Sequence, residues 1–132
     1  MVKYLVSYAV IKSCGTIEII FKDIIYQHLI QNANSEAISF FTKKIKESSS
    51  NPKTDRICDT LNQLNKSWSN SFKTQVNGSS NKSMLNSLVD LRNQLAHGNS
   101  ISPSINDIIN QFKAACNVLS ILDSIVHTYP PV

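Results

Sequence analysis

Apolar residues recur every three or four positions along most of the chain, which is the spacing of residues that share one face of an α-helix. The first such run extends from about Tyr4 to His28. Its apolar face comprises, at steps of three and four, Val10, Cys14, Ile17, Phe21, Ile24 and His28. This face is widened by Ile11, Ile20, Ile25 and Leu29, so we expect the helix to lie deep in a bundle. Gly15 costs this helix roughly 1 kcal/mol relative to alanine, and we expect it to mark a close helix crossing.

Polar breaks divide the rest of the chain into further helical segments. Ser35 is expected to cap a second helix, which ends before a polar loop at 47–53. A third helix carries apolar residues at helical spacing from Ile57 to Trp68 and is expected to continue towards Val76. A fourth helix is expected to run from about Ser83 to His97.

The last helix has the clearest pattern. Gly98 ends the helix before it, because glycine adopts the left-handed conformation of a helix C-terminus without strain. Pro103 or Ser104 then opens a helix that Tyr129–Pro131 ends. Its apolar residues alternate at steps of three and four: Ile105, Ile108, Phe112, Ala115, Leu119, Leu122 and Val126. The chain shows no internal repeat and no strand pattern, so the predicted fold is all-α, an up-and-down bundle of four to five helices.

Composition agrees with one helical domain over residues 1–132. A chain of 132 residues with 42% hydrophobic and 17% charged residues is not intrinsically disordered. With only three Gly, the chain is neither collagen-like nor of low complexity. The net charge of +4 favours polyanionic partners. The basic run Lys43–Lys46 is more typical of a solvated helix face than of a nucleic-acid stripe.

The cysteines argue against a disulfide framework and a metal site. Cys14, Cys58 and Cys116 form no C-x-x-C pair and no Cys/His cluster, so we expect small buried hydrophobes in a reducing compartment, with no metal and no cofactor. No uninterrupted stretch reaches about 18 apolar residues. Ser7 and Lys12 interrupt the apolar N-terminal segment. We therefore expect a helix of a cytoplasmic protein without membrane contact, and not a signal peptide.

The segment Leu91–Gly98, LRNQLAHG, carries the candidate chemistry. Asn93 and His97 lie one helical turn apart and share a face, whereas Arg92 lies about 140° from His97. Arginine is long enough to reach round, and a second copy across a two-fold axis could also join these groups in one cleft. The Arg guanidinium matches phosphate oxygens, and His transfers protons near neutral pH. The alternative for the isolated pattern is a surface arginine and a histidine stabilised by the helix dipole.

The sequence LVDLRNQLAHGNS resembles the R-N-x-x-A-H-G signature of HEPN domains, and within that superfamily most resembles the RiboL-PSP-type branch. The resemblance covers about residues 5–127. It includes a long first helix that bears Glu18, an aromatic second helix around Phe40–Phe41, and a segment with Trp68. HEPN domains are small helical bundles that dimerise and often act as metal-independent endoribonucleases.

The resemblance implies an active site at a dimer interface, where two motifs, one from each subunit, line a cleft. The ribose 2′-oxygen would attack the neighbouring phosphorus and leave a 2′,3′-cyclic phosphate. His97 would transfer the proton, Arg92 would stabilise the transition-state charge, and Asn93 would orient the substrate or His97. Such a protein would be the toxin or effector of a prokaryotic toxin–antitoxin or defence system, with an antitoxin or regulatory protein as partner. Some HEPN toxins carry a modified Tyr two residues after the His; here that position is Asn99, which puts this control in doubt.

Four further residues allow two interpretations each. Glu18 lies among apolar neighbours on the first helix, so it either accepts a hydrogen bond from Arg92 and orients it or lies at the edge of the apolar face. Tyr8 and Trp68 could stack on bases, but their spacing favours positions in the core. His28 is expected to be a packed or C-terminal histidine and not a catalytic one.

Two alternatives to the ribonuclease remain. One is a catalytically inactive HEPN module that binds RNA or nucleotides, or mediates dimerisation and protein partnering. The other is a helical adaptor that presents a groove to another protein, for which Arg92 and His97 would be dispensable. The retained Arg92 and His97 favour the enzyme, with RNA as its substrate and a second copy of the chain as its partner.

Overall fold

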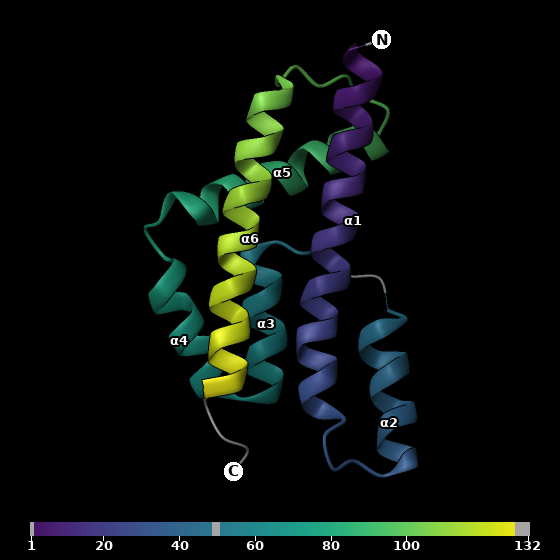
Figure 1. Ribbon diagram of the computed structural model, residues 1–132, viewed down its shortest axis with the longest axis vertical. Helices are drawn as coiled ribbons and strands as arrows, with labels where there is room; N and C mark the ends of the chain where they lie inside the picture. The colour runs from purple at the N-terminus through teal and green to yellow at the C-terminus, as the bar shows by residue number, and fades with distance from the viewer. Residues whose placement is uncertain (1, 49–50, 129–132) are drawn as a thin grey trace.

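A computed structural model describes residues 2–48 and 51–128 of the chain, which form an all-α bundle (Figure 1). This confirms the predicted fold class; the described ranges contain no strand. A π-helical turn, Thr42–Lys46, extends the second helix. The α-helices are α1 (Val2–Leu29), α2 (Ser35–Phe41), α3 (Thr54–Leu64), α4 (Lys66–Val76), α5 (Ser80–Ala96) and α6 (Ile105–Thr128).

The long helices α1 and α6 run along the molecule, and α5 crosses both of them (Figure 1). The core between these helices contains the predicted apolar face of α1, including Val10, Ile17 and Phe21, and that of α6, including Leu122. The predicted widening of the α1 face is confirmed for Ile25, which is buried, and for Leu29, which packs against the core, but it was wrong for Ile11 and Ile20, which are exposed. One face of α1 packs on α5 and α6, and the residues beside that face remain in solvent.

The predicted third helix is two helices, because the chain breaks at Asn65. The backbone of Asn65 is extended, with φ −160° and ψ 111°. Its side chain caps α4 by accepting hydrogen bonds from the backbone N–H groups of Ser67 at 3.0 Å and Trp68 at 3.4 Å. The Ser69 hydroxyl donates to the carbonyl of Cys58 at 3.2 Å and holds α4 against α3. The described ranges therefore hold six α-helices and not four to five.

Side-chain caps fix where two other helices begin. Asn34, and not the predicted Ser35, caps α2 by accepting from the N–H of Ala37 at 2.8 Å. Ser104 opens α6 as predicted: its hydroxyl accepts from the N–H of Asp107 at 3.1 Å, and the Asp107 carboxylate accepts from the N–H of Ser104 at 2.9 Å. The predicted stop at Tyr129–Pro131 lies outside the described residues.

By length and composition, α1 is apolar enough to cross a membrane, with a mean hydropathy of 1.4 over its best window. Counting uninterrupted apolar residues missed this property. The core helix of a soluble protein passes the same test. Because α1 contributes core residues that pack on α5 and α6, the fold is compatible with a soluble protein.

Candidate active site

The segment 92–98 ends α5 in a turn that requires a glycine. The N–H of Gly98 donates to the carbonyl of Leu95 at 3.0 Å, and the N–H of Asn99 donates to the carbonyl of Gln94 at 2.9 Å. Gly98 has φ +80°, which only glycine adopts at little cost. This Schellman turn stops the helix directly after the motif. The prediction placed His97 in the helix; it is instead the cap residue, and it is exposed to solvent.

Arg92 continues the buried stripe of α5 beyond the core. Leu85, Leu88 and Val89 are buried, and Arg92 follows them at the same helical spacing. Arg92 itself is exposed, whereas Leu91 and Leu95 beside it still pack against the core. The helical row that contains Leu85, Leu88 and Val89 therefore ends in a cation, Arg92, which lies beside α1.

A cleft of about 370 Å³ opens where this part of α5 faces α1. Its walls come from three helices and from the loop before α3. The residues that line it are Ile11, Cys14, Gly15 and Glu18 from α1, Asn51 and Pro52 from the loop, Arg56 from α3, and Val89, Arg92 and Asn93 from α5. Three of the predicted site residues, Arg92, Asn93 and Glu18, thus line one cleft.

His97 is not among the described residues that line this cleft. The helix gives way to the terminal turn before His97, so its side chain does not follow that of Asn93 into the cleft. Only the backbones of the two residues are joined, through the N–H of His97 and the carbonyl of Asn93 at 3.1 Å. In one protomer, Arg92 and Asn93 line the cleft, and His97 is not among the described residues that line it.

The pKa of the buried Cys14 thiol depends on two charged residues of the cleft. Burial raises its pKa to about 11; the Arg92 guanidinium opposes this rise and the Glu18 carboxylate adds to it. The thiol contacts the carbonyl of Leu88 at 3.6 Å. Cys14 is accordingly a protonated packing residue at neutral pH, as predicted, and Arg92 and Glu18 both lie close enough to act on it.

Glu18 forms an ion pair with Lys22 at 3.3 Å, and the Lys22 ammonium also donates to the carbonyl of Ser48. Glu18 thus lies at the rim of the buried face and in the wall of the cleft. Its orienting action on Arg92 stays a prediction.

Arg56 is a cleft residue that the sequence analysis missed. It brings a second guanidinium to the same cleft as Arg92. Nothing in the local sequence marks it, because Arg56 is an exposed residue of α3. Only the packing of the loop and α3 beside α1 brings it near the motif.

The close helix crossing expected at Gly15 was wrong. A Cβ atom built on Gly15 would have no heavy atom of the described residues within 4 Å. Gly15 instead lies in the wall of the cleft. The missing side chain leaves the α1 backbone bare beside Arg92 and Asn93.

The structure tests the predicted burial of four further residues, Tyr8, Cys116, Trp68 and His28. Tyr8 is 65% exposed and Cys116 is exposed, so their predicted burial was wrong. Trp68 is buried as predicted, and the His28 ring lies edge-on to it with 5.0 Å between ring centroids. Burial lowers the pKa of His28, and His127 lowers it further. His28 is therefore a packed residue.

The N-terminal half of α1 presents a run of apolar side chains to solvent. The exposed members are Val2, Tyr4, Leu5, Tyr8 and Ile11. Tyr4, Tyr8, Ile11 and Gly15 follow at helical steps of four and three, so they share one face that leads into the cleft. Contiguous exposed apolar surface of this kind is typical of interaction sites.

The comparison with known proteins gives one match. A family model described as RiboL-PSP-HEPN matches residues 2–128. No curated protein and no solved structure matches the sequence.

Proposed function

The chain belongs to the RiboL-PSP-HEPN family, and on this premise we propose that it is a metal-independent endoribonuclease whose active site contains Arg92, Asn93 and His97. The observation that carries the proposal is the cleft beside the end of α5. Arg92 and Asn93 line it together with the second guanidinium of Arg56. Two permanent cations next to hydrogen-bonding groups suit a phosphodiester, because guanidinium groups bind phosphate oxygens in a bidentate manner.

Each residue of the motif has a role in the proposed reaction. The ribose 2′-oxygen attacks the adjacent phosphorus and loses its proton, the bond from phosphorus to the 5′-oxygen breaks, and that oxygen gains a proton. The products are a 2′,3′-cyclic phosphate and a 5′-hydroxyl. His97 transfers protons, Arg92 stabilises the negative charge that develops on the phosphoryl oxygens, and Asn93 orients the substrate or His97.

We propose a homodimer in which each cleft is completed by the other subunit. Two observations support this. His97 does not line the cleft of its own protomer among the described residues. The exposed apolar face of Tyr4, Tyr8 and Ile11 leads into the same cleft and offers a surface for a second copy. Related by a two-fold axis, two copies would bring both motifs together.

Cleavage of a labelled RNA mixture tests the enzyme. We expect the wild-type protein to cleave in the presence of EDTA and to leave 2′,3′-cyclic phosphate ends. His97→Ala should lower the rate by about 10²–10⁴-fold, the usual contribution of general acid–base catalysis. His127→Ala is the matched control, because His127 is an exposed histidine near the end of α6. It should cleave as the wild type does.

Two outcomes would contradict the proposal. Activity that EDTA removes and added metal restores would contradict the metal-independent mechanism. Absence of cleavage by a folded, dimeric wild-type protein would favour the inactive HEPN module that binds RNA or nucleotides.

The biological proposal is a toxin or effector of a prokaryotic defence or toxin–antitoxin system, active in the cytoplasm where its RNA substrates are. Because position 99 is Asn, control through a tyrosine two residues after the histidine is not part of this proposal. Expression of the wild type in bacteria should arrest growth, and expression of His97→Ala should not. Growth arrest by both proteins would contradict the role.

A further inference from the structure

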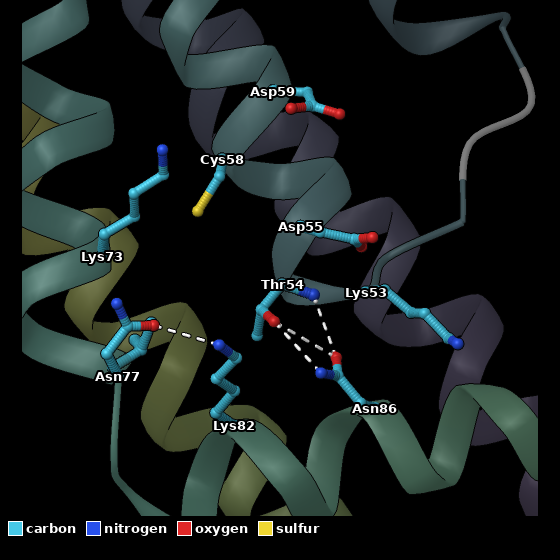
Figure 2. A pocket seen from close by; sticks show the side chains of 10 residues that line it. Lys53, Thr54, Asp55, Cys58, Asp59, Lys73, Asn77, Lys82 and Asn86 are labelled. Carbon is cyan, nitrogen blue, oxygen red and sulfur yellow. Dashed lines mark hydrogen bonds between the residues drawn. The ribbon is translucent and has the colours of Figure 1, made fainter.

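A second cavity, of about 550 Å³, lies where α3, α4 and α5 meet. It is larger than the cleft beside Arg92 and is lined by different residues. Figure 2 shows its walls: Lys53, Thr54, Asp55, Cys58 and Asp59 from the start of α3, Lys73 and Asn77 from the end of α4, and Lys82 and Asn86 from α5. Its volume is in the range of pockets that hold a small organic ligand.

Hydrogen bonds hold two walls of this cavity in place. Thr54 is buried, and its N–H and hydroxyl donate to the Asn86 side-chain oxygen at 3.0 and 3.3 Å. The Lys82 ammonium donates to the Asn77 side-chain oxygen at 3.0 Å. Because this bond occupies the amide oxygen of Asn77, its NH₂ group is left to donate. The Asn77 amide and the Lys82 ammonium are therefore hydrogen-bond donors in the wall of the cavity.

Three lysines and two aspartates line the cavity. Lys73 and Lys82 stand on opposite helices and flank the Cys58 thiol (Figure 2). Lys53 points away from the cavity and pairs with Asp90. Asp55 and Asp59 also line the cavity, but their side chains leave α3 in another direction than the Cys58 thiol does (Figure 2). The lysines that line the cavity outnumber the aspartates, and Lys73 and Lys82 are the cations on the side of the Cys58 thiol (Figure 2).

The Cys58 thiol points into the cavity (Figure 2) and is only 8% exposed. In the described part of the chain its sulfur has no hydrogen-bond partner. Burial raises the pKa of this thiol; Lys73 and Lys82 oppose the rise, and Asp59 and Asp55 act less strongly in the other direction. The order of these effects agrees with the geometry, because the lysines lie nearer the thiol's side of α3 than the carboxylates do.

We propose that this cavity binds a phosphate group, held by the ammonium groups of Lys73 and Lys82 and by the amide of Asn77. A phosphate dianion matches two ammonium groups in charge and accepts hydrogen bonds from all three side chains. The phosphate could come from a free nucleotide or from the backbone of an RNA strand. The site is separate from Arg92 and does not rest on the proposed cleavage.

Titration with inorganic phosphate and with a 5′-mononucleotide, followed by calorimetry, tests the site directly. The wild type should bind both. Lys73→Gln and Lys82→Gln should each weaken binding at this cavity roughly tenfold, as expected for the loss of one charge-assisted contact, and the double variant should retain only the binding that the Arg92 cleft provides. Lys82→Arg keeps the charge and should bind. Lys66→Gln is the matched control, because Lys66 is an exposed residue of α4 that does not line the cavity.

The Cys58 thiol supplies a second, local readout. In a Cys116→Ser background, bound nucleotide should slow alkylation of Cys58 measured by mass spectrometry, and the double lysine variant should lose this protection. Cys14 serves as the internal reference, because it lies in the other cleft.

The same variants distinguish the two sources of phosphate. If an RNA oligonucleotide without terminal phosphates protects Cys58, the strand backbone supplies the group; if only the mononucleotide protects it, the ligand is a free nucleotide. The proposal is overturned if the wild type binds no phosphate, if the double variant binds as tightly as the wild type, or if Arg92→Ala alone removes binding.

Discussion

The two halves of α5 differ in what surrounds them. In the first half Leu85, Leu88 and Val89 are buried in the core. In the second half Arg92 is exposed, although it continues the same helical stripe, and the cap residue His97 is exposed as well. The first half stabilises the fold. The second half still packs Leu91 and Leu95 against the core, but its polar face carries Arg92 and Asn93 in the wall of the cleft.

The helix α1 shows the same contrast in the reverse direction. Its C-terminal half buries Ile17, Phe21 and Ile25, and its N-terminal half exposes Tyr4 and Tyr8. The N-terminus of α1 lies near the turn that follows α5 (Figure 1). We call residues 2–15 and 92–98 the motif end of the molecule. Substitutions of exposed residues there should change cleavage and assembly, and substitutions of core residues, among them Val6, Val10 and Cys14, should change stability.

The largest effect is expected from a charge in the exposed apolar face. Tyr8→Lys should make the protein monomeric and lower RNA cleavage at least about a hundredfold, because the second motif is then missing from the cleft. The fold should persist, since Tyr8 is 65% exposed. Sedimentation and cleavage assays check this. Ile19→Lys is the matched control: Ile19 is an equally exposed apolar residue of α1 outside the motif end. Cleavage by a verified monomer would contradict the shared site.

The core half of α5 should respond in the opposite way. Leu88→Ala should lower the free energy of unfolding by about 2–5 kcal/mol, because it removes a fully buried side chain. Gln94→Ala, an exposed change on the same helix, should stay within about 0.5 kcal/mol of the wild type. Urea denaturation measures both. If both variants lost the same free energy of unfolding, the two halves of α5 would not differ in their contribution to stability.

Replacing Gly15 should change the stability of the fold and the rate of RNA cleavage in opposite directions. Gly15→Ala should raise the free energy of unfolding by up to about 1 kcal/mol, because alanine is the better helix former and its Cβ meets no neighbour. The same methyl group enters the cleft beside Arg92, so we expect cleavage to fall severalfold. Ser87→Ala, on an exposed face of α5, controls for helix propensity alone. Unchanged cleavage would mean that substrate does not approach this wall.

The smallest effect concerns pH and the packed half of the molecule. Burial lowers the pKa of His28 in the folded protein, so the unfolded chain binds the proton more readily. The contribution of His28 to stability is complete above the unfolded value of about 6.5 and is lost as the pH falls through the lower, folded pKa. His28→Gln should therefore flatten the decline of melting temperature between pH 7 and pH 5. An identical decline in both proteins would assign it to other groups.

Periodicity predicted the buried faces of α1 and α6, because core packing imposes a regular spacing on apolar residues. It did not predict the break at Asn65, since Leu61, Leu64 and Trp68 keep helical spacing across the break. Nor did periodicity distinguish core residues from exposed apolar residues such as Tyr8, because burial depends on which other helices pack against each face.

The candidate site divides in a similar way. Arg92, Asn93 and His97 belong to a local motif and could be singled out from the sequence. Arg56, the bare wall at Gly15 and the separation of His97 from the cleft depend on how α1, α3 and α5 pack. Local sequence carries no signal for such tertiary arrangements.

Mixing two inactive variants tests the shared site most directly. Arg92→Ala and His97→Ala should each be inactive alone. Unfolding and refolding them together in equal amounts should give mixed dimers as about half of the population, and each mixed dimer retains one Arg92 and, on the other subunit, one His97. We predict that cleavage with 2′,3′-cyclic phosphate products returns in this mixture. Verified mixed dimers without any cleavage would contradict an active site built from two subunits.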